Sequence, residues 1–168
     1  SVGKDDSARA LLDNSVIKMH DEIIDNLQFL DKKLIGIHEG HHTWNLQSGG
    51  NLDQRLASAL HAPYLGWTAS TRLVLVRENA HIVRGGGNVY TMVSSHGNAN
   101  GAKVGAAVNW MESKMVASFD ADHFVMGHVC KNANFTPQMR KRVRRTGAPG
   151  IENHLPRCLI VGGFSEGY

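Results

Sequence analysis

His128 and Cys130 are the side chains of this sequence that most directly suggest metal chemistry. They follow the apolar run Phe124 to Gly127, in a segment that reads DADHFVMGHVCK from Asp120. An apolar run of this length that stops at a glycine is typical of a buried strand whose backbone turns at its end. After such a turn, the imidazole and the thiolate could converge on one metal ion or on two adjacent ions. The alternative for this segment alone is a hydrogen-bonded loop histidine.

Two further segments repeat this arrangement of a short strand followed by histidine and glycine. The strand expected over Lys33–His38 leads into GHHT, Gly40 to Thr43, and the strand expected over Val89–Ser94 leads into His96 and Gly97. A metal ion needs imidazole ligands held about 2.0–2.1 Å away, and strand ends position them better than loops do. In open α/β folds, ligands gather at the carboxyl ends of strands. The sequence therefore predicts a metal site built from three strand ends, with three unrelated structural histidines as the alternative.

Composition predicts one ordinary globular domain over residues 1–168. The chain is 42% hydrophobic and 20% charged, with a net charge of only +3 that says little about its partners. No apolar run approaches the roughly 20 residues that a membrane span needs, and the N-terminus does not read as a signal peptide. Two cysteines cannot form a disulfide framework, so we expect a reducing, cytoplasmic setting and no membrane partner.

The rest of the chain predicts helices and strands in mixed order, hence an α/β fold. Asp5 to Ser7 should cap an amphipathic helix whose apolar residues recur every three or four positions and pack on something larger. That stripe comprises Leu12, Val16, Met19, Ile23, Leu27 and Leu30. A short helix is expected with Leu52, Leu56 and Leu60, closed by Pro63, followed by strands over Leu73–Arg77 and Val89–Ser94 with turn residues Gly85 to Asn88 between them. A second helix is expected over Val104–Ala117, with Val104, Val108, Met111 and Met115 on one face. A loop around Gly147 to Asn153 and a last strand over Cys158–Val161 complete the expected elements.

The order of these motifs resembles the calcineurin-like metallophosphoesterases, and the phage-type versions most closely. The motifs are GHHT, SSHG from Ser94, ADHFVMGHVCK from Ala121, and GGFSEGY from Gly162. The resemblance implies a metallophosphoesterase-like αββα sandwich around two divalent metal ions, Mn²⁺, Zn²⁺ or Fe²⁺. It also implies hydrolysis of a phosphomonoester or phosphodiester, with nucleic acid or a nucleotide among the substrates, as in a nuclease-like enzyme.

Residue by residue, the resemblance implies His41, His96 and His128 as ligands of one ion and Cys130 as a ligand facing the other. It implies His42 as the catalytic histidine beside the leaving group. His41 stands where the family has asparagine, and Cys130 stands where the family has histidine. Both departures keep a donor atom and soften the ligand set, which favours Zn²⁺ or Fe²⁺. Thr43 replaces an acidic residue of the family.

The resemblance also implies an incomplete fold, because the family's first motifs, Asp-x-His and Gly-Asp, do not appear before Gly40. We therefore expect a fragment or one half of a split protein. Its uncovered apolar sheet surface would then favour self-association or a partner chain that supplies the missing strands. A second functional hypothesis is a catalytically inactive metal-binding or interaction module. Lys103 and the basic run Arg140 to Arg145 could hold phosphate, although a solvated strand or loop is the favoured interpretation of that run.

Overall fold

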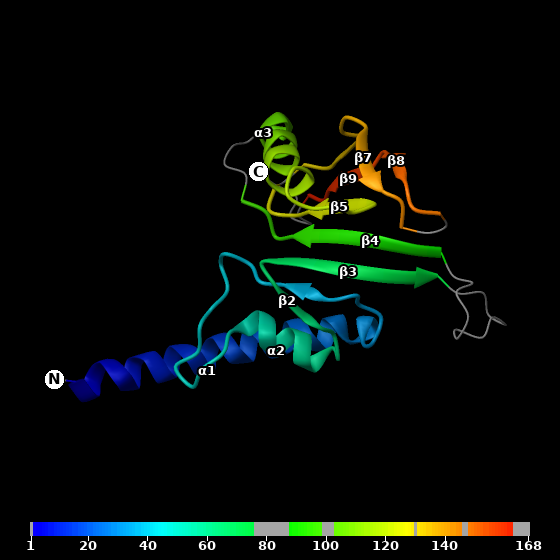
Figure 1. The fold of residues 1–168 in the computed structure, drawn as a ribbon. Helices are drawn as coiled ribbons and strands as arrows, with labels where there is room; N and C mark the ends of the chain where they lie inside the picture. The colour runs from blue at the N-terminus through cyan, green and yellow to red at the C-terminus, as the bar shows by residue number, and fades with distance from the viewer. Residues whose placement is uncertain (1, 76–87, 99–102, 130, 146–147, 163–168) are drawn as a thin grey trace. The chain divides into compact units, whose positions relative to one another are not determined.

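The computed structural model describes residues 2–75, 88–98, 103–129, 131–145 and 148–162, and it shows a mixed α/β chain (Figure 1). The chain divides into two compact units, Ser1–Trp67 and Thr68–Tyr168. The α/β class expected from the sequence is confirmed at this level. The finer expectations of an αββα sandwich and of a single domain stay predictions.

The first unit consists of helices and one small sheet. Its elements are α1 (Val2–Leu27), the 3₁₀ turn η1 (Gln28–Leu30), β1 (Ile37–His38), α2 (Leu52–Ala59) and β2 (Tyr64–Gly66). Strands β1 and β2 pair in parallel and form a two-stranded sheet. Helix α2 begins at a capping box, in which the Asn51 side chain accepts from the Gln54 backbone and the Gln54 side chain accepts from the Asn51 backbone. The predicted short helix before Pro63 is therefore confirmed.

Helix α1 presents a different face to its unit from the one its apolar spacing predicts. The buried side chains along it include Asp13, His20 and Ile24, whereas Met19 and Ile23 of the predicted stripe are 67% and 49% exposed. Asp13 explains the difference, since its carboxylate accepts hydrogen bonds from the Trp44 indole N–H and from the Gln47 backbone N–H. The buried face is set by this polar anchor together with Ile24. The helix also begins at Val2, so the predicted cap residues lie inside it.

The second unit is built on a five-stranded sheet. Its elements are β3 (Thr68–Leu75), β4 (Asn88–Ser95), α3 (Val104–Trp110), the π-helical turn η3 (Met111–Val116), β5 (His123–Met126), β6 (Ala133–Phe135), β7 (Arg140–Val143), β8 (Ile151–His154) and β9 (Arg157–Ile160). The strand order is β3-β4-β5-β9-β6. The three central strands β4, β5 and β9 run parallel, while β3 and β6 pair antiparallel at the two edges. A separate antiparallel ribbon joins β7 and β8.

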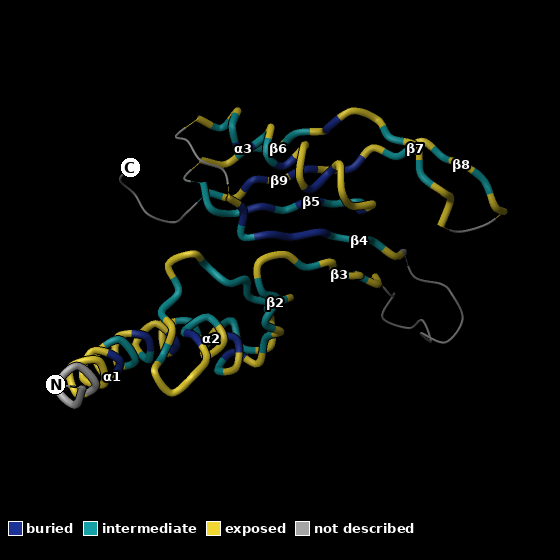
Figure 2. The backbone as a smooth tube through the Cα atoms, turned by 60° about the vertical axis from the view of Figure 1, so that its left-hand side comes forward, coloured by how far each residue is buried: buried dark blue, intermediate teal, exposed yellow. Residues whose placement is uncertain are grey.

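The core of this unit lies on one face of the sheet. Alternation along the strands turns Phe124 and Met126 of β5 to the same side as Cys158 and Ile160 of β9, and all four are completely buried. Helical residues from α3 and η3, including Met111, complete the cluster. Figure 2 shows the result as dark blue stretches along the central strands. The apolar spacing of the predicted helix over Val104–Ala117 therefore marks a face that is buried, although its second half is π-helical.

Several sequence-based boundaries need correction. The strand expected over Lys33–His38 is reduced to two residues, and it belongs to a sheet of the first unit instead of sharing one with β4 and β5. Ile151 to Asn153, expected in a loop, lie in β8. The turn residues Gly85 to Gly87 and most of the terminal GGFSEGY motif lie outside the described residues. Among the described helices, none is long and apolar enough to cross a membrane.

Candidate metal site

Strands β4 and β5 deliver His96 and His128 to one edge of the second sheet. The two strands are parallel neighbours, and Ser95 at the end of β4 pairs in register with Met126 at the end of β5. His96 follows Ser95 directly, and His128 follows Met126 after a single glycine. Parallel pairing makes both carboxyl ends meet at the same edge, as the sequence predicted for these two strands.

The two imidazole rings face each other at a distance suited to a shared metal ion. Nδ1 of His128 lies 3.2 Å from Nε2 of His96, and the ring centroids are 5.1 Å apart at an interplanar angle of 69°. Two imidazole nitrogens bound tetrahedrally at about 2.0–2.1 Å from one ion stand roughly 3.3 Å apart. The same separation also fits an N–H···N hydrogen bond when no ion is bound. Both rings are half-buried, so an ion between them would remain accessible from solvent.

The backbone at the two strand ends holds these rings through tight local packing. His128 has a φ of +71° and Gly97 has a φ of +90°, which are turn conformations that redirect the chain after each strand. The Gly127 N–H donates to the Ser95 carbonyl at 3.2 Å. The Ser95 hydroxyl accepts from the Gly97 N–H at 3.2 Å and lies 3.0 Å from the hydroxyl of Thr68. The His96–Gly97 turn is thus tied to the sheet beneath it.

His41 and His42 lie in the turn that follows β1, in the first unit. Their ring centroids are 3.8 Å apart, and both side chains are exposed. Because they belong to the other unit, the roles of His41 as a third ligand and of His42 in catalysis stay predictions of the sequence.

Hydrogen bonds within the first unit fix the chain just before this histidine turn. The Gly40 N–H donates to the Asp53 carboxylate at 2.9 Å, and the Glu39 N–H donates to the Gly66 carbonyl at 3.0 Å. The Glu39 carboxylate accepts from the hydroxyl of Tyr64. Glu39 is therefore engaged in holding the turn to β2, a supporting role that the sequence does not reveal.

The letters of His38 to His42 also match the HExxH pattern of zinc proteases. That pattern places two histidines on one face only when it forms a helix. Here His38 ends β1, where its Nδ1 atom lies 2.8 Å from the carbonyl of Gly66, and residues 39–42 form a loop and turn. The local backbone therefore gives no support to a helical zinc motif.

The remaining predicted ligand, Cys130, lies outside the described residues. Within the described part of the chain, we find a place for one ion and no support for a second. Within the second unit, His96 and His128 are the described residues that could bind the ion together.

The chain matches no protein-family model, no curated protein and no solved structure. The resemblance to calcineurin-like metallophosphoesterases therefore rests on its ordered motifs alone.

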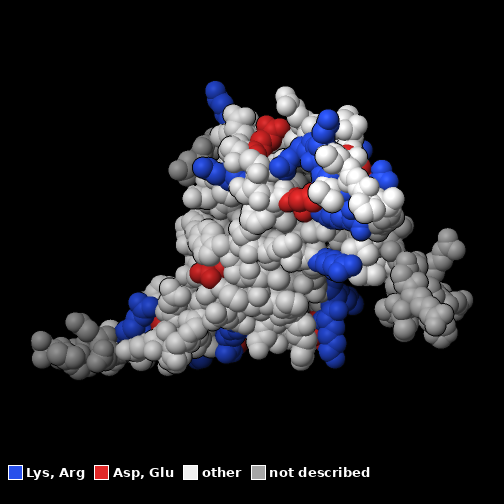
Figure 3. Space-filling view, viewed as in Figure 1, with Lys and Arg blue, Asp and Glu red and all other residues white. Residues whose placement is uncertain are grey.

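The basic run lies in strand β7 and the two residues after it, and several of its arginines pair with acidic neighbours. Arg142 bridges Asp122 at 2.6 Å and Glu152 at 2.8 Å, and Arg145 contacts Asp122 at 3.1 Å and Asp120 at 3.0 Å. Figure 3 shows red acidic side chains interspersed among the blue basic ones in this part of the surface. The strand interpretation is confirmed, but two of its arginines hold the ribbon to the start of β5 instead of extending into solvent.

Asp122 is the centre of this ion-pair network. Burial would raise its pKa, but the Thr91 N–H, which donates to it at 2.8 Å, and the guanidinium groups of Arg142 and Arg145 lower the pKa below its usual value. The carboxylate therefore stays ionised and joins the β7–β8 ribbon to the sheet. Sequence reasoning missed this role, since the contacts join residues twenty or more positions apart.

Proposed function

We propose that this chain forms the metal-binding part of a metal-dependent phosphoesterase, in which His96 and His128 hold a divalent ion. The observation that carries the proposal is the 3.2 Å approach of their ring nitrogens at the carboxyl ends of two parallel strands. Imidazole pairs favour Zn²⁺, Fe²⁺ and other borderline ions over Mg²⁺. His41 is the proposed third ligand, on the strength of the motif order in the sequence.

A bound divalent ion would polarise a phosphoryl oxygen and lower the pKa of a bound water. The chain's own part is to orient the ion through two rigid strand ends and to supply a proton donor. His42 is proposed to donate a proton to the departing oxygen, a task that suits an imidazole near neutral pH. Phosphomonoesters and phosphodiesters, including nucleotides and nucleic acid, are the proposed substrate class.

The first experiment measures metal content and turnover together. The purified protein is loaded with Zn²⁺ or Mn²⁺, and hydrolysis of bis(p-nitrophenyl) phosphate is followed. We expect His128→Ala to lose both the metal and the activity, and His42→Ala to lose activity while keeping the metal. His61→Ala is the matched control, because this exposed histidine pairs with Asp31 and is neither a predicted ligand nor the predicted catalytic residue. Activity that survives the combined His42→Ala and His128→Ala change would refute the proposal.

A catalytically inactive metal-binding module is the second candidate. This candidate is favoured because the described residues offer a place for one metal ion, whereas the phosphoesterase chemistry implied by the resemblance uses two. This candidate predicts stoichiometric metal that depends on His96 and His128, with no turnover of phosphomonoesters or phosphodiesters. Elemental analysis of the wild-type protein and of His96→Ala, combined with the hydrolysis assay, separates the two candidates.

A further inference from the structure

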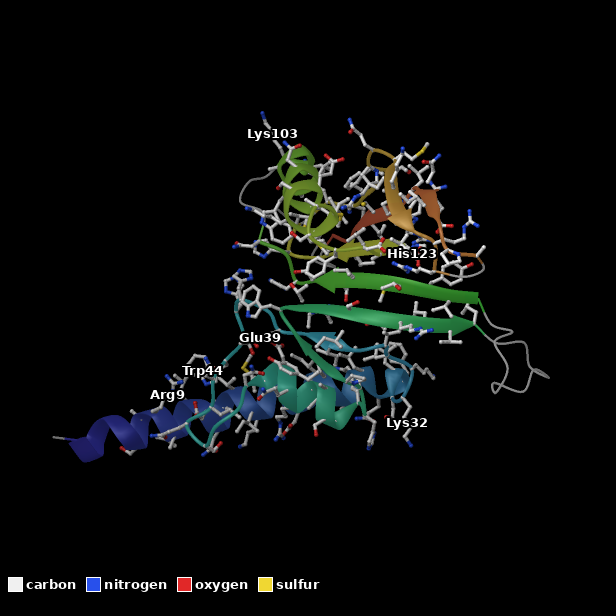
Figure 4. The ribbon with its side chains drawn as sticks, in the orientation of Figure 1. Arg9, Lys32, Glu39, Trp44, Lys103 and His123 are labelled. Atoms are coloured by element: carbon white, nitrogen blue, oxygen red, sulfur yellow. The ribbon has the colours of Figure 1, made fainter. Side chains whose placement is uncertain are left out.

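The sheet of the second unit carries a cavity on the face opposite its core. The cavity measures about 360 Å³, within the size range of small-molecule sites. Residues from all five strands of the sheet line it, among them Leu73, Met92, His123, Asn134, Arg157 and Leu159. It lies where β5 begins, at the opposite end of that strand from His128. His123, which is labelled in Figure 4, marks this end of the strand.

Strand alternation places a polar pair and an apolar pair of side chains next to each other along β5 and β9. The register pairs His123 with Arg157 and, two residues further along the same parallel strands, Val125 with Leu159. Residues two apart share a face of the sheet, so an imidazole and a guanidinium lie side by side, followed by two aliphatic side chains. Met92 pairs with His123, and Leu73 pairs with Tyr90, so these two apolar residues lie on the β3–β4 side of the imidazole. A ligand along β5 and β9 would meet the guanidinium and the imidazole first and the two aliphatic side chains afterwards.

Arg157 brings positive charge to this cavity without an acidic neighbour. Among the described residues its guanidinium donates to the hydroxyl of Thr136 at 3.2 Å, and no carboxylate lies within ion-pair distance. Arg142 and Arg145, by contrast, are each paired with Asp122. The His123 ring lies 5.9 Å from the ring of Tyr90. Charge complementarity therefore favours an anionic group beside Arg157.

We propose that this cavity binds an amphiphilic monoanion, a carboxylate that carries a short aliphatic chain. The carboxylate accepts hydrogen bonds from Arg157 and His123, and the chain covers Val125 and Leu159. A guanidinium can meet a carboxylate through two parallel N–H···O bonds, which fixes the orientation of the ligand. The aliphatic chain removes from water the side chain of Leu159, a residue that is 43% exposed.

The test uses octanoate as the probe and two partial probes as comparisons. Binding to the full chain is measured by calorimetry, and contact is localised by NMR shifts of the His123 ring and the Leu159 methyl groups. Octan-1-ol has a similar chain without the charge, and acetate has the charge without the chain. We expect octanoate to bind at least about 10-fold more tightly than either one, because each lacks half of the proposed contacts.

Variants at the polar and apolar ends complete the test. Arg157→Gln should weaken octanoate binding about 10-fold or more, and Leu159→Asn should weaken it while acetate binding stays unchanged. Lys141→Gln is the matched control, since it removes a positive charge from β7, outside the cavity. Circular dichroism establishes that each variant is folded. Equal octanoate affinity of wild type and a folded Arg157→Gln would overturn the proposal.

Other occupants of the cavity give different results. If acetate binds as tightly as octanoate, the apolar part takes no part in binding and the proposal fails. If sedimentation shows a dimer that Leu159→Asn dissociates, and octanoate shifts no cavity resonance, the face is an interface between copies of this chain. That result would also overturn the ligand proposal.

Discussion

Gly97 packs against Met126 so closely that a Cβ atom on Gly97 would stand 2.6 Å from Cγ of Met126. The same Cβ would lie 3.1 Å from the carbonyl oxygen of Gly127. Gly97 directly follows His96, just after β4 ends, and Met126 is the last residue of β5, two positions before His128. The spacing of the imidazoles therefore depends on the absence of a side chain at Gly97.

Gly97→Ala should destabilise the second unit by about 2–5 kcal/mol. A φ of +90° is unfavourable for alanine, and the added methyl group would force the strand ends apart. Urea unfolding measures the loss. Gly105→Ala is the control in the same unit, because no atom lies within 4 Å of its Cβ position and alanine favours its helix. We expect that control to be neutral or stabilising, and equal effects of the two changes would contradict the packing argument.

His41→Ala should weaken binding of Co²⁺ or Zn²⁺ at least about 10-fold if His41 is a ligand beside His96 and His128. Cobalt is informative because its visible absorption reports the number and type of its ligands. The weaker binding by His41→Ala should be accompanied by a change in the visible absorption spectrum of the bound Co²⁺. His61→Ala, with an exposed imidazole that pairs with Asp31, should leave both readouts unchanged. An unaltered spectrum in His41→Ala would limit the site to the two histidines of the second unit.

Two adjacent isoleucines of α1 test which face of the helix is packed. Ile24 is 8% exposed and Ile23 is 49% exposed. Ile24→Ala should cost about 2–4 kcal/mol of unfolding free energy, since it leaves a cavity, whereas Ile23→Ala should change it by less than about 0.5 kcal/mol. Both changes remove the same atoms from the same helix, so propensity effects cancel. A larger loss of unfolding free energy for Ile23→Ala than for Ile24→Ala would mean that the face predicted from apolar spacing is the packed one.

Asp122 should contribute stability that acid removes. Its pKa is lowered in the folded protein, because hydrogen bonds from Thr91 and Arg142 outweigh the opposing effect of burial. Folding therefore favours the ionised form, and this stability is present above the unfolded pKa and lost as the pH falls below about 4. Asp122→Asn should lower stability near neutral pH by about 2 kcal/mol and make the protein less sensitive to acid.

The control for Asp122 is Asp120→Asn. Asp120 pairs with the same Arg145, but its side chain is 53% exposed. An exposed pair contributes less than about 1 kcal/mol, so this variant should unfold with nearly the wild-type dependence on pH. Urea titrations between about pH 3 and pH 7 compare the three proteins. If Asp122→Asn loses as much stability at low pH as the wild type does, another carboxylate is responsible for the acid sensitivity.

Cys158 should resist alkylation in the folded protein. It is completely buried, and burial, aided by the charge of Glu112, raises the pKa of its thiol to about 11. The reactive thiolate is therefore scarce near about pH 8. Iodoacetamide labelling followed by peptide mass spectrometry should show little modification of Cys158 without urea and complete modification with it. Comparable labelling under both conditions would mean that this part of the core opens readily.

Local pattern in the sequence was enough to predict the elements of the second unit that carry the site. The apolar run Phe124 to Gly127 indicated a buried strand, and its final glycine indicated a turn that presents His128. The spacing of Met111 and Met115 marked the buried side of the helix, as found. These features depend on neighbours within a few residues, which a linear sequence displays directly.

Contacts between distant residues decided the rest. The carboxylate of Asp13 accepts a hydrogen bond from Trp44, thirty-one positions away, and this contact lies on the buried face of α1. The spacing of apolar residues had predicted that a neighbouring face, with Met19 and Ile23, is buried. The parallel register of β4 and β5 brought the nitrogens of His96 and His128 within 3.2 Å, whereas the third predicted strand joined a different sheet. Residue types and local periods thus determined which side chains can bind a metal. Long-range pairing selected which of them meet, because hydrogen-bond register and polar burial are set only when the chain has folded.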